Sequence, residues 1–231
     1  MNQHGKQVSA REAILSNIAE KLDSGRRGLA AVETRIREHQ SGILPQVDAD
    51  PARLKARFVD KALLSAASVE VVARPDAGEA IMRWLREHNL PQQLRHGADK
   101  RLADIQWPEH GGPQIAIGRS DGSDLTGLSH AFAGVAETGT LILVSGQDNP
   151  TTLNFLPENH IVLVEAKDIA ANYETVWARL REIHGAGGMP RTVNMVTGPS
   201  RSADIEQTLI LGAHGPVRLH ILVIGDREPA G

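Results

Sequence analysis

Apolar residues recur at two different spacings along the chain, and the spacing changes near residue 68. Before that point they follow a helical period from Ile14 to Leu22. Ser9 precedes this stretch and suits a helix N-cap, whereas Gly25 follows it and suits a helix end. The pattern therefore predicts an amphipathic helix near the start of the chain.

Two more helices are predicted before residue 68. One covers residues 29–39, and the other begins in "DPARLKARFVDKALLSA", where Asp50 suits the N-cap and Pro51 the first helical position. The stretch "QSGILPQVDADP" between them has the composition of a linker. We therefore predict a helical N-terminal extension over residues 1–45 and an α/β domain over residues 46–231.

Short apolar runs alternate with helical patterns from residue 68 onward. Helices are predicted over 80–87, 168–183 and 202–211. The predicted strands are SVEVVAR (68–74), QIAIG (114–118), TLILVSG (140–146), HIVLVE (160–165), TVNMVTG (192–198) and RLHILVIG (218–225). Strands this apolar are usually covered on both faces, which predicts a layered α/β domain with a mixed or largely parallel sheet. Ligand sites in such sheets tend to lie beyond the carboxyl ends of strands.

Composition removes several classes of function. The 231 residues contain no cysteine, which excludes disulfides, a thiolate nucleophile and a cysteine-held zinc or iron–sulfur site within this chain. One tyrosine, three phenylalanines and no dense Lys/Arg tract give no platform for nucleic acid. There is no apolar run long enough for a membrane span or a secretory signal, so we expect a cytoplasmic protein.

The stretch "TGPSRSADIE" (197–206) has the chemistry of an anion site. Gly198, Ser200 and Arg201 form a turn ahead of a predicted helix, whose first N–H groups and dipole favour a phosphate or carboxylate. Ser202 and Asp204 would add a hydroxyl and a carboxylate. The alternative is structural: Ser202 caps the helix, and Asp204 complements its dipole.

Two further candidates lie beside predicted strands. In "AGVAETGTLILV", Glu137 could act as a base, and Thr138, Gly139 and Thr140 could bind an anion, or these residues only shape a turn. In "GAHGPVRLHILVI", His214 could transfer a proton or serve as a turn histidine. We predict that all three clusters converge on one cleft for a small anion, with Glu137 and His214 as the catalytic candidates.

Other local motifs are absent from the sequence. The ten histidines form no HxxxH-type metal motif, and no GxGxxG follows a predicted strand, which disfavours a nicotinamide site. His160, together with Pro157, is interpreted as fixing the entry of a strand. We therefore predict no metal and no cofactor in this chain.

Three segments together carry a family resemblance: "AETGTLIL", "NFLPENHIVLV" and "TGPSRSADIEQTLILGAHGP". They resemble the LUD domain family of lactate utilization protein C over about residues 60–225, most specifically over 134–217. Ser202 stands where threonine is frequent in the family. The matching residues are Glu137, Thr138, Gly139, Thr140, Pro157, His160, Gly198, Pro199, Ser200, Arg201, Asp204, Ile205, Glu206, Gly212, His214, Gly215 and Pro216.

The resemblance implies a three-layer fold similar to the NagB/RpiA/CoA-transferase-like proteins, with the N-terminal helices as an addition. It also implies a role beside two cysteine-rich iron–sulfur subunits in the oxidation of L-lactate to pyruvate, the clusters residing in those partners. We favour a non-redox subunit or accessory protein of that system. A stand-alone isomerase- or transferase-type enzyme for an anion, sugar phosphate or CoA ester, and a small-molecule sensor, remain alternatives.

Overall fold

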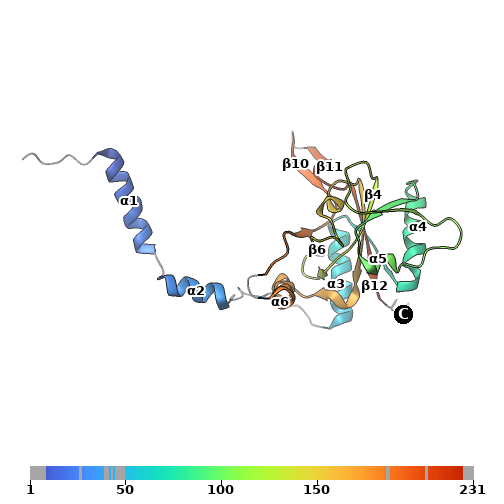
Figure 1. The fold of residues 1–231 in the computed structure, drawn as a ribbon, viewed down its shortest axis with the longest axis horizontal. Helices are drawn as coiled ribbons and strands as arrows, with labels where there is room; N and C mark the ends of the chain where they lie inside the picture. The colour runs from blue at the N-terminus through green and yellow to red at the C-terminus, as the bar shows by residue number, and fades with distance from the viewer. Residues whose placement is uncertain are drawn as a thin grey trace, which may run out of the picture. The chain divides into compact units, whose positions relative to one another are not determined.

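The computed structural model describes residues 9–25, 28–38, 42, 44, 50–185, 188–205 and 208–225. The chain divides into two compact units, Met1–Leu44 and Pro45–Gly231. The first contains α1 (Ala10–Gly25) and α2 (Leu29–Glu38), drawn in blue in Figure 1. Folding of residues 46–231 without the first 45 stays a prediction. None of the helices described is both long and apolar enough to cross a membrane.

The helix caps predicted at Ser9 and Asp50 are confirmed. Glu12 N donates to Ser9 Oγ at 3.3 Å, and Ser9 N donates to the Glu12 carboxylate at 2.9 Å, which together form a capping box ahead of α1. In the second unit, Asp50 accepts from Arg53 N at 3.0 Å at the start of α3 (Pro51–Leu64). Phe58 and Ala62 form the buried side of α3.

Six parallel strands make the main sheet, in the order β1-β12-β7-β4-β2-β3. Their bounds are β1 Ser68–Val72, β2 Gln93–His96, β3 Gln114–Ile117, β4 Thr126–His130, β7 Asn159–Glu165 and β12 Arg218–Ile224. Four of these strands were predicted, but β2 and β4 were not, because their short sequences QLRH and TGLSH lack a continuous apolar run.

The second sheet has four strands in the order β8-β5-β6-β9. Their bounds are β5 Ala133–Val135, β6 Thr140–Val144, β8 Ile169–Ala170 and β9 Val193–Val196. It is mixed, since β6 runs antiparallel to β5 and β9, and β8 runs parallel to β5. Residues 168–170 belong to a 3-10 turn and to β8, so the helix predicted from residue 168 begins only at Tyr173 (α6, Tyr173–His184).

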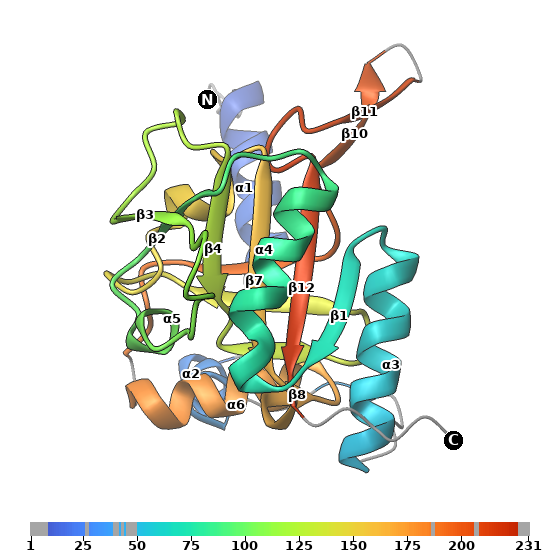
Figure 2. The same cartoon turned by 90° about the vertical axis from the view of Figure 1, so that its right-hand side faces the viewer.

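Both faces of the main sheet are buried at its central strands, as the apolar runs predict, whereas the edge strand β3 is largely exposed. On one face, α4 (Ala77–Glu87) packs Ile81 and Leu85 against β7 residues Ile161 and Leu163; Figure 2 shows α4 across these strands. On the other face lie α3 and the second sheet, and α6 packs on the far side of the second sheet. The fold is therefore a layered mixed α/β domain with a largely parallel sheet.

The helix predicted over 202–211 is wrong. The chain there forms an antiparallel ribbon of β10 (Arg201–Ile205) and β11 (Thr208–Leu211), which projects from the body of the domain in Figure 2. Ile205 and Leu209 have helical spacing in the sequence, but "TLIL" also reads as a short strand, and the pairing of Arg201 with Leu211 selects that conformation.

Candidate functional site

Glu137, Thr138 and Gly139 lie in the turn between β5 and β6, and Thr140 begins β6. Gly139 N donates to the carbonyl of Val135 at 2.9 Å, and Gly139 has a φ of +70°. A Cβ at this position would overlap the α3 backbone at Lys61 and Ala62. Glycine is therefore required both by its conformation and by the close approach of the turn to α3.

Thr197 and Gly198 lie directly after β9 and approach the end of the same helix. Gly198 has a φ of +73°, and a Cβ there would overlap the carbonyl oxygen of Ser65, the C-cap residue of α3. Since β6 and β9 pair antiparallel, Thr140 and Thr197 become neighbours although 57 positions separate them. Two of the predicted clusters thus meet at the C-terminal end of α3.

Four hydroxyl groups gather at this meeting point. Thr140 Oγ1 lies 2.7 Å from Thr138 Oγ1, 2.8 Å from the Tyr173 hydroxyl and 2.6 Å from Thr197 Oγ1. Thr138 and Tyr173 are 2.9 Å apart. Thr140 is fully buried, so its hydroxyl depends on these partners. We call this set the hydroxyl cluster.

Glu137 lies at the edge of the hydroxyl cluster and is half-buried. Its backbone N–H donates to the carbonyl of Ala171 at 3.1 Å, which ties the turn to the segment before α6. Within the described residues its carboxylate has no hydrogen-bond partner, so it remains available to accept one from a ligand. The predicted role of Glu137 as a base is compatible with this position and stays a prediction.

Ser200 is hydrogen-bonded to the third predicted cluster, the segment "GAHGP" that contains His214. Its N–H donates to the carbonyl of Pro216 at 2.9 Å, its carbonyl accepts from Gly212 N at 3.0 Å, and its hydroxyl accepts from His214 N at 3.3 Å. The residues between Gly212 and Pro216 therefore fold around Ser200. These contacts place Ser200, which follows the carboxyl end of β9, at the amino end of β12.

His214 lines a pocket of about 330 Å³ at the amino ends of β7 and β12. The pocket brings together "NFLPENH" and "GAHGP", two of the motifs that carry the family resemblance. Its polar groups include Glu158 and His214, and its apolar walls include Phe155 and Val217. The full lining is Phe155, Leu156, Pro157, Glu158, Gly212, Ala213, His214, Gly215 and Val217.

The anion site loses its predicted helix. Ser202 does not cap a helix, because it lies in β10, so the helix N–H groups and dipole predicted from this segment are not formed by the described residues 201–205. Arg201 begins β10 with an exposed side chain. The side chains of Ser202 and Asp204, and the whole of Glu206, lie outside the described residues.

The predicted site residues thus form two groups. Thr138, Gly139, Thr140 and Gly198 meet at the end of α3, whereas Ser200 and His214 meet at the amino end of β12. The pocket that His214 lines includes neither Glu137 nor Arg201 among the residues described for it. Their convergence on one cleft stays a prediction.

His160 is completely buried in β7. Its Nε2 lies 2.9 Å from Ser129 Oγ, and its Nδ1 has no partner among the described residues. Burial lowers the pKa of His160 to about 3, so the ring is neutral at pH 7. Asn154, in the same motif, is also buried, and neither polar atom of its amide is bonded within those residues. His160 therefore does more than fix the entry of a strand, because its buried Nδ1 atom needs a hydrogen-bond partner in the interior.

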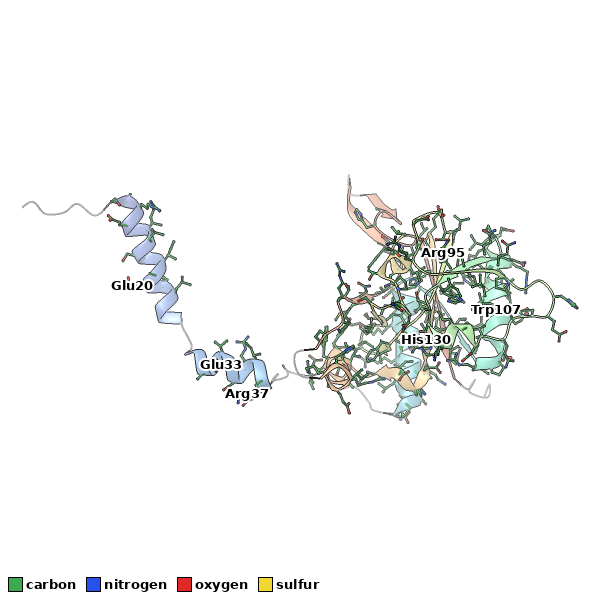
Figure 3. All side chains as sticks on the ribbon, in the orientation of Figure 1. Glu20, Glu33, Arg37, Arg95, Trp107 and His130 are labelled. Atoms are coloured by element: carbon green, nitrogen blue, oxygen red, sulfur yellow. The ribbon has the colours of Figure 1, made fainter. Side chains whose placement is uncertain are left out.

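A charged cluster at the carboxyl end of the main sheet was not predicted. His130, last in β4, has Nδ1 2.9 Å from the carbonyl of Ala131 and Nε2 3.1 Å from Glu165 Oε1, and Arg74 forms an ion pair with that same oxygen. Burial, followed by the positive charge of Arg101, lowers the pKa of His130 to about 4. Figure 3 shows His130 inside the α/β unit.

No local motif signals this cluster, since its members come from separate elements. Arg74 precedes α4, Arg101 lies in the short helix α5 (Lys100–Ala103), and Glu165 ends β7. Arg74 Nη1 donates to the carbonyl of Arg101 at 3.3 Å, which links the two arginines. Finding these residues from the sequence would have required knowing the order of the strands in the sheet, because that order brings the strand ends together. In the part of the chain described, no three His, Asp or Glu side chains come together as a metal site.

Comparison with known proteins identifies sequence relatives. The family model of the LUD domain matches residues 6–224. A protein of Halalkalibacterium halodurans named lactate utilization protein C is 28% identical over 95% of this chain and 100% of its own length. A Geobacillus protein of the same name is 30% identical over 68% of this chain and 67% of its own. An uncharacterized protein of Neisseria meningitidis is 39% identical over 61% of this chain and 70% of its own.

One solved structure is similar in fold. The crystal structure of a DUF162 family protein from Deinococcus radiodurans aligns with a TM-score of 0.52 and 22% identity, covering 77% of this chain and all of that one. This likeness supports the mixed α/β fold. The narrower assignment to the NagB/RpiA/CoA-transferase-like proteins stays a prediction.

Proposed function

The chain belongs to the LUD domain family, and we propose that it serves lactate utilization as a non-redox subunit or accessory protein of an iron–sulfur system that oxidises L-lactate to pyruvate. The observation that carries this proposal is the match to a relative named lactate utilization protein C along that relative's whole length. The absence of cysteine fits a division of labour in which the partner subunits hold the clusters.

The pocket beside His214 is the surface that we assign to contact with those partners. Phe155 and Leu156 at this pocket are 42% and 46% exposed, and they lie in a motif segment that carries the resemblance. Large apolar side chains gathered at a hollow on the surface are typical of protein–protein contacts. The β10–β11 ribbon begins one residue after Ser200, beside the same pocket.

A pull-down of the tagged full chain from cells grown on L-lactate tests the subunit role. We expect cysteine-rich iron–sulfur proteins to copurify with the wild-type chain and to be lost with Phe155→Glu. Ile183→Glu, on α6, is the matched control because Ile183 is 64% exposed and outside the pocket. Recovery of no such partner with the wild-type chain would contradict the subunit role. Equal recovery with both variants would contradict only the assigned surface.

The purified chain alone should be colourless and inactive in L-lactate oxidation. A stoichiometric flavin or iron–sulfur spectrum, or turnover of a phosphorylated or CoA substrate by the isolated chain, would favour a stand-alone enzyme. Growth on L-lactate by a strain lacking the gene, restored by the wild-type chain, is the matching test in cells. Unimpaired growth of the deletion strain would argue against a role in lactate utilization.

A further inference from the structure

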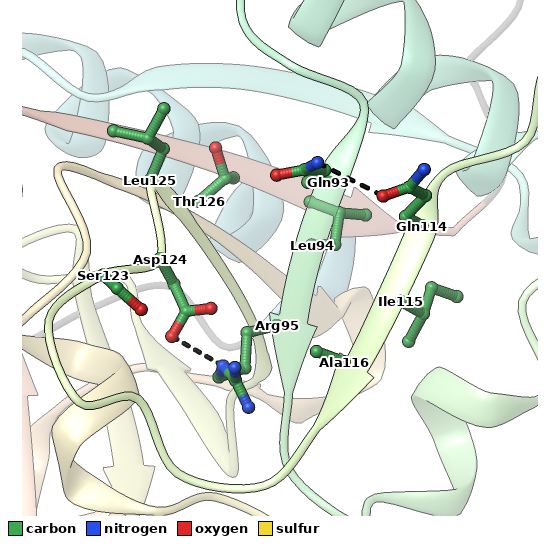
Figure 4. Close-up of a pocket in the computed structure, with 10 residues that line it drawn as sticks. All are labelled: Gln93, Leu94, Arg95, Gln114, Ile115, Ala116, Ser123, Asp124, Leu125 and Thr126. Atoms are coloured by element: carbon green, nitrogen blue, oxygen red, sulfur yellow. Dashed lines mark hydrogen bonds and ion pairs between the residues drawn. The ribbon is translucent and has the colours of Figure 1, made fainter.

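A second pocket lies at the free edge of the six-stranded sheet, along β2 and β3 and beside the segment that leads into β4 (Figure 4). It encloses about 420 Å³, and small-molecule sites commonly enclose about 300–1,000 Å³. No residue of the three family motifs lines it, and the function proposed above does not use it. Its chemistry therefore needs a separate explanation.

An ion pair occupies one end of this pocket. Arg95 Nε lies 2.6 Å from Asp124 Oδ2, and Ser120 Oγ donates to that same oxygen at 2.7 Å. Both side chains are mostly buried, and Figure 4 shows them pointing toward each other. Within the described chain, Asp124 Oδ1 and the two Nη atoms of Arg95 have no partner. The pair thus offers a fixed acceptor and fixed donors to a ligand.

Uncharged polar groups occupy the other end. Gln93 Nε2 donates to Gln114 Oε1 at 3.2 Å, which leaves the Gln93 amide oxygen available. Thr126 is only 1% exposed, and its hydroxyl bonds to nothing among the residues described. A buried hydroxyl without a partner is uncommon in a folded protein, and a bound ligand would supply one. Figure 4 shows Gln93 and Thr126 at the same end of the pocket.

The charges of the lining select the class of ligand. Arg95 and Asp124 are the charged members of the lining described, so the lining has no net charge, and the exposed Asp121 carboxylate outside it also interacts electrostatically with Arg95. An anionic ligand would approach the Asp124 carboxylate, and a cationic ligand would approach the Arg95 guanidinium. A molecule with both charges on neighbouring atoms satisfies both groups at once, because its potential is complementary to theirs.

We propose that this pocket binds a free α-amino acid with an uncharged polar side chain. The α-ammonium group donates to Asp124 Oδ1, and the α-carboxylate accepts from the Nη atoms of Arg95. The side chain extends toward Gln93 and Thr126, while Ile115 and Leu125 cover its aliphatic part.

Calorimetry of the full chain with L-glutamine, L-asparagine, L-serine and L-threonine tests this proposal. We expect at least one to bind, and we expect Arg95→Gln and Asp124→Asn each to weaken it by about tenfold to a hundredfold, because each removes one charge-assisted bond. Thr126→Val should weaken binding by about twofold to tenfold without lowering the midpoint of thermal unfolding. Arg86→Gln is the control, since Arg86 pairs with Glu79 on the surface.

Ligand analogues test the charge requirement without changing the protein. The N-acetyl derivative of the amino acid that binds lacks the ammonium charge, and its α-amide lacks the carboxylate. We expect both to bind at least tenfold more weakly. Equal binding of either analogue, no binding of any of the four amino acids, or binding unaffected by the Arg95 and Asp124 variants would overturn the proposal. None of these outcomes bears on the pull-down from cells grown on L-lactate.

Discussion

Replacing Thr140 by valine removes the central hydroxyl of the hydroxyl cluster while nearly preserving the shape of the side chain. That hydroxyl lies within 2.6–2.8 Å of three others, which is the full capacity of one donor and two acceptor sites. Thr138 and Tyr173 remain bonded to each other in the variant, whereas Thr197 loses the partner described for it. Thr138, Tyr173 and Thr197 each lose one hydrogen bond in the variant, but only Thr197 is left without a partner for its hydroxyl among those described.

The expected loss of stability follows from these contacts. A net hydrogen bond contributes about 0.5–1.5 kcal/mol, and a buried polar group left without a partner costs about 1–3 kcal/mol. Because Thr140 is fully buried and valine leaves no large cavity, we expect Thr140→Val to lower the free energy of unfolding by about 2–3 kcal/mol. Urea unfolding at pH 7, followed by tryptophan fluorescence and circular dichroism together, measures this difference.

Two further variants decide whether the hydroxyl cluster is the cause. Thr140→Ser keeps the hydroxyl and loses only a methyl group, so it should retain most of the stability that valine loses. Thr140→Val and Thr197→Val should be non-additive by about 1 kcal/mol, because their oxygens are in contact. A valine variant that loses less than about 0.5 kcal/mol, or strict additivity of the pair, would refute this reasoning.

Three other predictions concern backbone, pH and domain structure. Gly139→Ala and Gly198→Ala should each cost more stability in urea unfolding than Gly118→Ala, because all three have positive φ but only Gly118 has open space for a Cβ. The pKa of His160 is lowered from 6.5 to about 3 in the folded state, so the contribution of the buried neutral ring to the free energy of unfolding is fully present above pH 6.5. That contribution should fall by about 1.4 kcal/mol per pH unit as the pH drops toward 3, and the wild-type stability profile should be steeper than that of His160→Gln. A chain of residues 46–231 should keep a cooperative unfolding transition, and a molten product would contradict the predicted boundary.

The sequence predicted the strands that carry several large apolar side chains, whether these are buried as in β7 or exposed as in β3, and missed β2 and β4, which carry one each. In β7 and β12 the continuous apolar runs IVLV (161–164) and ILVI (221–224) are buried, so the run itself identifies a central strand. In β4 all five positions are buried as well, but TGLSH contains a single large apolar residue, Leu128. Strand β4 is buried because it lies between β7 and β2, and that position depends on the order of strands in the sheet.

The same limit explains what was found of the site. Thr138 and Thr140 were identified from one short motif, but their meeting with Thr197 depends on the antiparallel pairing of β6 with β9. The cluster of His130, Glu165 and Arg74 depends in the same way on parallel strand ends that are far apart in sequence. Local patterns identify reactive groups, whereas the sheet decides which of them become neighbours.

The four residues from Thr197 to Ser200 connect the two groups of site residues, and each end is held by a different part of the fold. Thr197 is bonded into the hydroxyl cluster, Gly198 packs against the last turn of α3, and Ser200 is hydrogen-bonded to the segment from Gly212 to Pro216. These contacts hold the base of the β10–β11 ribbon, where Ser200 bonds to Gly212 and Pro216. The hydroxyl cluster and the pocket of His214 are therefore joined by a short stretch of backbone that is held at both ends.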